Sequence, residues 1–355
     1  MTYGAYDDRE PGAYDDYVIG DAAYDAGLID GHVDVRRDDA SAASMKDTLA
    51  DRRTAAIRRC TDDAAALGRS MLYGMTTSLE LQSIPLPASC DLDMSILHST
   101  ASEAGKRIRR RRAGDTSQQH VWTHLDADAP VRIRRNVYAL DLFHTWAQLS
   151  PHVPLADLVM LGDAILTAKC DDPNRDSVAA GGRDDGRDDG RDDGRDALAA
   201  FVDGLTRFTG IRRCRRALAL VECHVLSPKE TEARLAPMAH GIPRPVTNYV
   251  VPGVFFESGV PMTVDLAWPE YQVAVEYDGD HHRTDRSQWH RDRNKRGLLQ
   301  SRGWIVLDIM ADMLASEAAR AEYAFRLARL LASRGAVFDF RVVAMPLEQL
   351  ADSMP

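Results

Sequence analysis

Three carboxylates lie where two predicted strands end in the C-terminal third of the chain. Asp265 falls in the apolar run 262–268, and Glu276 and Asp278 close the run 271–279. Side chains two residues apart on a strand point the same way, so Glu276 and Asp278 are expected to share a face. Clustered carboxylates raise one another's pKa, and a bound Mg²⁺ relieves this because it prefers oxygen ligands. The pattern predicts a divalent-metal site.

Basic residues and a histidine follow these acids and would suit phosphodiester chemistry. A Mg²⁺ or Mn²⁺ ion polarises a phosphodiester and activates a water, and His282 would act as base or orient that water. The segment 288–302 is a predicted basic helix, whose Arg291, Arg293 and Lys295 would contact phosphates.

Helices and strands that would position these residues are predicted both before and after the acids in the sequence. Ser227, Pro228 and Glu230 form a helix start with N-cap, N1 proline and capping-box glutamate, and the cap alone would explain Glu230. Strands are predicted at 249–251, 262–268, 271–279 and 304–309, with helices at 288–302 and 317–334.

This arrangement resembles the DUF559 family, which is related to the very-short-patch-repair endonucleases in the PD-(D/E)XK superfamily. The resemblance rests on 263–270 and 275–282, joined by Asp292, Arg296 and Leu299 and by the glycine and tryptophan of the 303–307 segment. It implies an α/β fold for 227–335, a restriction-endonuclease-like mixed central sheet flanked by helices.

The resemblance also implies site roles, carried over residue by residue. Asp265 and Glu276 match the family's first- and second-strand acids and would bind Mg²⁺ or Mn²⁺, directly or through water. Asp278, His282 and Glu230 match the acid before the glycine, the histidine after it and the glutamate of the opening helix. Two departures are that the superfamily's lysine two residues after the second acid is replaced by Asp278, and that a histidine at 281 stands where glutamine is common.

The upstream region 49–170 is predicted to be a mixed helix and strand domain. Residues 62–84 would form either a helix-turn-helix or an ordinary helical pair, and strands are expected at 94–97, 119–123 and 132–140. Segment 106–112 holds six basic residues, and its Arg109, Arg110 and Arg111 would contact phosphates or lie at a solvated hairpin tip. Residues 142–146 and 154–164 more weakly resemble AbiEi-type antitoxins, so this domain would bind DNA or a partner protein.

Charge and repeats divide the remaining chain. Residues 1–48 repeat Gly-Ala-Tyr-Asp-Asp units and carry −8, which indicates a disordered acidic tail that would serve as a protein-binding segment at most. Residues 171–196 repeat Gly-Arg-Asp-Asp and carry −5, which is typical of a flexible linker. The remaining chain then carries +3 of the net −10, so the folded parts are compatible with nucleic acid. A helical segment is expected at 197–226 and a C-terminal tail at 336–355.

Several classes of protein are disfavoured. The chain has no run of 18 apolar residues and no signal-peptide pattern at its start, so a cytoplasmic protein without a membrane partner is expected. Five dispersed cysteines without a CxxC pair indicate reduced thiols and no zinc site, with Cys214 and Cys223 as buried packing residues.

Two functions follow from these patterns. The first is a metal-dependent endonuclease that hydrolyses DNA, with RNA as an open alternative substrate. The second is a catalytically inactive DNA-binding regulator or antitoxin-like protein that uses the nuclease fold as a scaffold.

Overall fold

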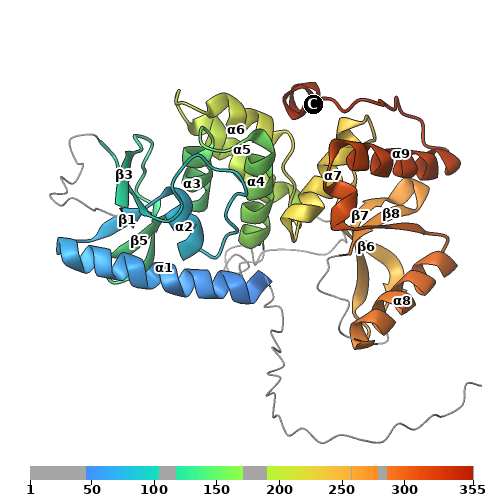
Figure 1. Cartoon of the computed structure of the whole chain (residues 1–355), viewed down its shortest axis with the longest axis horizontal. Coiled ribbons are helices and arrows are strands. Elements are labelled where there is room, and N and C mark those ends of the chain that lie inside the picture. The colour runs from blue at the N-terminus through green and yellow to red at the C-terminus, as the bar shows by residue number, and fades with distance from the viewer. Residues whose placement is uncertain (1–44, 104–116, 171–189, 257, 279–285, 355) are drawn as a thin grey trace, which may run out of the picture. The chain divides into compact units, whose positions relative to one another are not determined.

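The computed structural model describes residues 45–103, 117–170, 190–256, 258–278 and 286–354, without the side chains of 45–46, 190–193 and 286–293. These residues form helices and two mixed sheets, which confirms the predicted α/β class (Figure 1). Residues 42–355 make one compact unit.

The upstream sheet has five strands in the order β3-β2-β1-β5-β4. The strands are β1 (Met71–Tyr73), β2 (Leu97–Ala101), β3 (Ser117–Val121), β4 (Pro130–Arg134) and β5 (Val137–Leu140). Helix α1 (Met45–Leu67) buries Ala56, Cys60 and Ala64 against β1, β2 and β5. The small residues on this helix stripe allow the close approach that a helix on a sheet requires.

One interpretation of this region is wrong. The pair at 62–84 is not a helix-turn-helix, because strand β1 separates α1 from α2 (Met75–Leu81), and α2 is a short, mostly buried helix with no exposed recognition face. Strands β2 and β3 run parallel, with Leu97 opposite Ser117, and segment 106–112 between them lies outside the described residues. The strand expected at 94–97 begins only at Leu97. Arg109, Arg110 and Arg111 lie outside the described residues.

A helical layer follows the first sheet and packs around Trp146, which is fully buried. It contains α3 (Leu142–Leu149), α4 (Leu155–Cys170), α5 (Gly190–Gly204) and α6 (Ile211–Leu218). The helical segment expected at 197–226 is interrupted before α6, where Gly210 has φ +107° and lies so close to Ser150 that a Cβ there would meet its Oγ at 2.1 Å. Helix α5 also begins inside the predicted 171–196 linker, of which 171–189 lie outside the described residues.

The second sheet has the order β6-β7-β8-β9, with antiparallel pairs β6–β7 and β7–β8 and a parallel pair β8–β9. Its strands are β6 (Val246–Phe255), β7 (Pro261–Trp268), β8 (Val273–Tyr277) and β9 (Ile305–Ile309). Helices α7 (Pro228–Ala239) and α9 (Glu317–Ser333) share one core with the sheet. Leu299 of α8 (Arg286–Ser301) joins another. All four predicted strands and three predicted helices are present, with ends shifted by a few residues.

The predicted C-terminal tail is in part ordered and packed. Helix α10 (Leu347–Ser353) buries Leu350 and Ala351 in the upstream helical core, and Asp352 pairs with Arg216 of α6 at 2.6 Å. Apolar residues at the spacing of one helix turn account for this docking.

Two composition-based expectations can be compared with the structure. No helix in the described part of the chain is long and apolar enough to cross a membrane. No disulfide joins cysteines in the described residues, and Cys214 and Cys223 are buried as expected.

Candidate active site

The site begins with two acids on neighbouring strands. In the antiparallel pair β7–β8, Leu266 lies opposite Val275, and the same register continued by one residue sets Asp265 opposite Glu276. Directly opposed residues project from the same face of a sheet, so the two carboxyl groups lie on one face. Asp265 is held further, because its Oδ2 accepts a hydrogen bond of 2.8 Å from the backbone N–H of Tyr277.

A lysine from the following helix reaches this pair of acids. Lys295 of α8 places its Nζ 2.5 Å from Oε1 of Glu276, and both side chains are largely buried, at 17% and 23% exposed. The same ammonium lowers the pKa of Asp265 as well, although burial dominates and raises it. Lys295 therefore lies within the acid cluster, whereas the sequence suggested only a phosphate contact for it.

A third acid continues the row across the sheet. Asp308 of β9 is the parallel partner of Glu276 in the strand register, and it forms an ion pair with Arg296 of α8. Two successive residues of α8 thus pair with acids on two successive strands.

Glu230 enters from α7, at the N3 position of that helix. Ser227 caps the helix by accepting from the N–H of Glu230 at 3.2 Å, and the Glu230 carboxylate accepts in return from the N–H of Leu226 at 2.9 Å. The reciprocal bond goes to the residue before the N-cap, so the capping box differs by one position from its usual form. Burial and the charge of Asp265 raise the pKa of Glu230, and the hydrogen bonds of the cap lower it.

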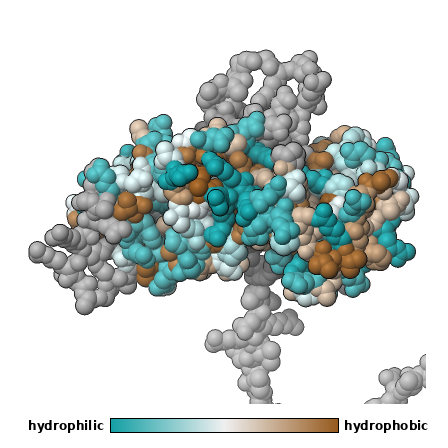
Figure 2. All heavy atoms as spheres, turned by 90° about the horizontal axis from the view of Figure 1, so that it is seen from above, coloured by the Kyte–Doolittle hydropathy of each residue, from teal (hydrophilic) through white to brown (hydrophobic). Residues whose placement is uncertain are grey.

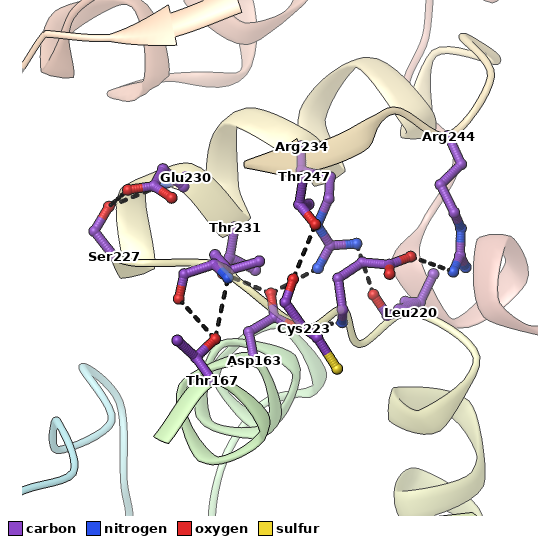
Figure 3. A network of polar contacts seen from close by, with 12 residues as sticks. Asp163, Thr167, Leu220, Cys223, Ser227, Glu230, Thr231, Arg234, Arg244 and Thr247 are labelled. Carbon is purple, nitrogen blue, oxygen red and sulfur yellow. Dashed lines mark hydrogen bonds and ion pairs between the residues drawn. The ribbon is translucent and has the colours of Figure 1, made fainter. Parts of the chain in front are cut away.

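Helix α7 is fixed in place by a buried polar network with α4, shown in Figure 3. Asp163 of α4 accepts from the N–H of Glu222 at 2.7 Å, from the hydroxyl of Thr231 at 2.8 Å and from Arg234 Nη2 at 2.6 Å. Arg234 also donates to the carbonyl of Leu220 at 2.7 Å. Asp163 and Arg234 are 1% and 0% exposed, so this pair lies in the interior. It sets the position of the helix that carries Glu230.

The acids of the site have unusual protonation equilibria. Burial raises the pKa of Glu276 to about 7, with Lys295 opposing the shift and Asp265 adding to it. Burial likewise raises the pKa of Glu230 to about 7, and the nearby charge of Asp265 contributes. Carboxylates in this state bind a cation or a proton readily near neutral pH, because either one removes the cost of a buried negative charge.

The donor set at Asp265 and Glu276 fits a divalent cation. Mg²⁺ is commonly held by one or two carboxylates together with several waters, which matches two oxygen-bearing groups on adjacent strands. As the side chains lie here, the ammonium of Lys295 balances the charge of Glu276. Over the described ranges, no group of three or more His, Cys, Asp or Glu side chains is arranged to hold a metal ion.

The other predicted site residues stand apart from this cluster or outside the described part. Asp278 follows β8 with an exposed side chain, and its N–H donates to the carbonyl of Ile309. His282 lies outside the described residues. Arg291 and Arg293 belong to α8, but the structure does not describe their side chains.

Sequence reasoning missed one member of the site and one contact within it. Asp308 was assigned to a strand without a role, although an acid between Leu307 and Ile309 in an apolar run was a usable signal. The pairing of Lys295 with Glu276 left no signal in the sequence, because the position of a helix relative to a strand depends on the connection between them.

Two curated relatives are similar to part of this chain. They are proteins of Mycobacterium tuberculosis described as uncharacterized protein MT2308, from strain CDC 1551 / Oshkosh, and uncharacterized protein Rv2248, from strain ATCC 25618 / H37Rv. Each is 33% identical over 122 residues, which is 34% of this chain and 43% of the relative, so the match spans less than half of either protein. No family model matches the chain, and no solved structure gives a significant match.

Proposed function

We propose that this chain is a divalent-metal-dependent endonuclease that hydrolyses DNA phosphodiester bonds at the Asp265–Glu276 pair. The observation that carries the proposal is the cluster itself: two largely buried acids opposed on neighbouring strands, with a buried lysine 2.5 Å from one of them. Desolvation penalises each charge of a buried acid–lysine group, so the group costs folding free energy. A functional role would account for its presence.

Each residue has a task that its position supports. Asp265 and Glu276 would hold Mg²⁺ or Mn²⁺, which when bound supplies Lewis acidity toward a phosphate oxygen and a more acidic water. Lys295 would place a positive charge beside the phosphate as negative charge develops on its oxygens. Glu230, with a pKa raised to about 7 by burial and by Asp265, would accept a proton near neutral pH.

DNA recognition in this proposal uses the basic residues near the site. Helix α8 carries Arg291 and Arg293 on the turns before Lys295, and they would contact the backbone phosphates. The resemblance of 227–335 to the DUF559 nucleases agrees with this substrate. Asp278 and His282 would position the attacking water, as that resemblance implies.

Cleavage of supercoiled plasmid with Mg²⁺ or Mn²⁺ tests the proposal. We expect nicking or linearisation by the wild-type chain, at least 100-fold slower with Asp265→Ala, and retained with Asp339→Ala, an exposed acid on another surface. Equal cleavage by wild type and Asp265→Ala would reject this site. A single-stranded RNA arm distinguishes RNA from DNA as substrate.

A DNA-binding protein without catalysis is the second candidate. It is favoured by the ion pairs of Lys295 with Glu276 and of Arg296 with Asp308, because they neutralise two of the acids without a metal. DNA binding that is unchanged by EDTA, together with no cleavage of plasmid, mismatched duplex or branched DNA, would support it. Metal-dependent cleavage of any of these substrates would exclude it.

A further inference from the structure

A surface groove lies over α6 in the upstream helical layer, away from the acid cluster in sequence. It has a volume of about 820 Å³ and is lined by Leu205 to Thr209, Ile211, Arg212 and Arg215. Figure 2 looks onto the molecule from the side on which α6 lies in Figure 1, and strongly hydrophilic residues stand beside hydrophobic ones there. The groove itself combines arginines with the apolar side chains of Leu205, Phe208 and Ile211.

The arginines of this region divide into two groups. Arg213 donates to the carbonyls of Ser150 and Val153 at 2.6 and 3.0 Å, and Arg216 pairs with Asp352, so these two hold the structure together. The groove arginines are exposed and make no ion pair with any acid in the described part of the chain; they are Arg207, Arg212 and Arg215. Three exposed positive charges on one groove favour a polyanion.

An aromatic pocket adjoins the groove and shares Phe208 and Thr209 with it. This pocket, of about 340 Å³, is also lined by Trp122, His124 and His152. Phe208 and His124 are half-buried and pack against Trp122, Phe208 edge-on with a ring-centroid distance of 5.0 Å and His124 tilted at 4.9 Å. Trp122 is fixed from behind, since its Nε1 donates to His144 Nδ1 at 3.1 Å. Phe208 and His124 also contact each other, with ring centroids 5.6 Å apart, so the three rings form one aromatic cluster at the pocket.

Polar groups in the pocket lining suit the edge of a heteroaromatic ring. Amide and imidazole side chains line it, including His120 and the buried Gln148. Gln148 is oriented by its bonds with Thr100 Oγ1 and with the N–H of Met75. Space for this amide is kept by Gly74, where a Cβ would lie 2.6 Å from the Gln148 oxygen. Fixed amides and imidazoles both donate and accept, as base edges require.

We infer that this groove and pocket bind a single strand of nucleic acid, with phosphates on Arg207, Arg212 and Arg215 and a base against Phe208 and His124. Bases of a single strand are unstacked and free to enter such a pocket, whereas those of a duplex are not. The groove extends past one base, which fits a strand better than a free nucleotide. Because the site lies outside the acid cluster, the inference holds whether or not the chain cleaves DNA.

Fluorescence anisotropy with labelled 20-nucleotide strands, measured in EDTA on the full chain, tests this binding. We expect single strands to bind more tightly than duplex. Arg212→Ala with Arg215→Ala should weaken binding about tenfold or more and lower the slope of log K against log salt by about 1.4. The matched control is Arg326→Ala with Arg329→Ala, two exposed arginines on α9, and it should bind as wild type. Parallel DNA and RNA strands show which sugar is preferred.

The base contact has its own readout. Phe208→Leu keeps an apolar side chain but removes the flat ring, and it should bind an ordinary strand about tenfold more weakly while binding an abasic strand as wild type does. Phe325→Ala, an exposed phenylalanine on α9 at 52% exposure, is the matched control and should change neither.

Wild-type binding by the groove arginine variant would overturn the inference. So would a preference for duplex, or abasic strands bound as tightly as ordinary ones, which would mark a general anion surface.

Discussion

Two groups of buried charges lie near α7, and they differ in how many hydrogen bonds their carboxylate oxygens accept from the protein. Asp163 and Arg234 lie in the interior, and the two oxygens of Asp163 together accept three hydrogen bonds from the protein (Figure 3). Asp265 and Glu276 lie where the β7–β8 pairing ends and share Lys295 as counter-charge, and burial raises the pKa of their carboxyl groups as it does that of Asp163.

The difference separates a structural cluster from a reactive one. A buried carboxylate whose oxygens are filled by protein donors has no capacity left for a ligand. The strand-end acids are several negative groups around one lysine, so a proton or a metal ion would still lower their energy. The following predictions test this distinction, from the largest effect to the smallest.

Loss of the interior pair should cost the most stability. Asp163→Ala leaves the guanidinium of Arg234 buried without a counter-charge, and we expect a loss of about 3–5 kcal/mol in the free energy of unfolding. Urea unfolding followed by circular dichroism measures it. In the double variant with Arg234→Met, the loss should be less than the sum of the two single losses. Additive losses would mean that the pair is not a coupled unit.

Removal of the lysine should act on function more than on the fold. With Lys295→Met, cleavage should slow about 100-fold, because the positive charge beside Asp265 and Glu276 is lost. Plasmid cleavage rates measure this, with Lys229→Met as control, since that half-exposed lysine pairs with Glu232. Rates within twofold of wild type would limit Lys295 to a structural role.

The raised pKa of Glu276 should appear in the pH dependence of stability. An acid whose folded pKa, about 7, lies above its unfolded value favours folding less as pH rises through that interval. Replacement by glutamine removes this titration, so the stability of Glu276→Gln relative to wild type should grow by roughly 1–3 kcal/mol between pH 5 and pH 8 without divalent metal. Chemical unfolding at both pH values measures this difference. A constant difference would contradict the raised pKa.

A smaller effect is expected at the edge of the interior cluster. Thr231→Val removes one of three donors to Asp163 while keeping the volume, and the unfolding free energy should fall by about 1 kcal/mol. Metal-dependent activity should be unchanged. A loss as large as that of Asp163→Ala would show that the network fails as a whole when one bond is removed.

Local patterns predicted the C-terminal half well. The N-cap at Ser227 and the strand runs around Asp265 and Glu276 are set by neighbouring residues, and they appear where the sequence placed them. Contacts between distant segments were not predictable in this way. The pairing of Asp163 with Arg234 spans 71 positions, and that of Arg216 with Asp352 spans 136, so neither leaves a local pattern.

Periodicity also failed where packing overruled it. The apolar spacing at 62–84 suggested two helices, but Met71 to Tyr73 pair with β5 as a strand because the sheet buries them. Likewise, the short apolar run near the C-terminus gave no sign that α10 docks on α6.

Binding of Mn²⁺ followed by electron paramagnetic resonance tests the acid site most directly, since free and bound ions give different signals. We expect one bound Mn²⁺ in the wild-type chain, held more tightly at pH 8 than at pH 6 because Glu276 and Glu230 lose protons in that interval. Asp265→Asn should abolish the binding, and Asp339→Asn should leave it intact. Equal Mn²⁺ binding by wild type and Asp265→Asn would contradict the assignment of this strand pair as a metal site.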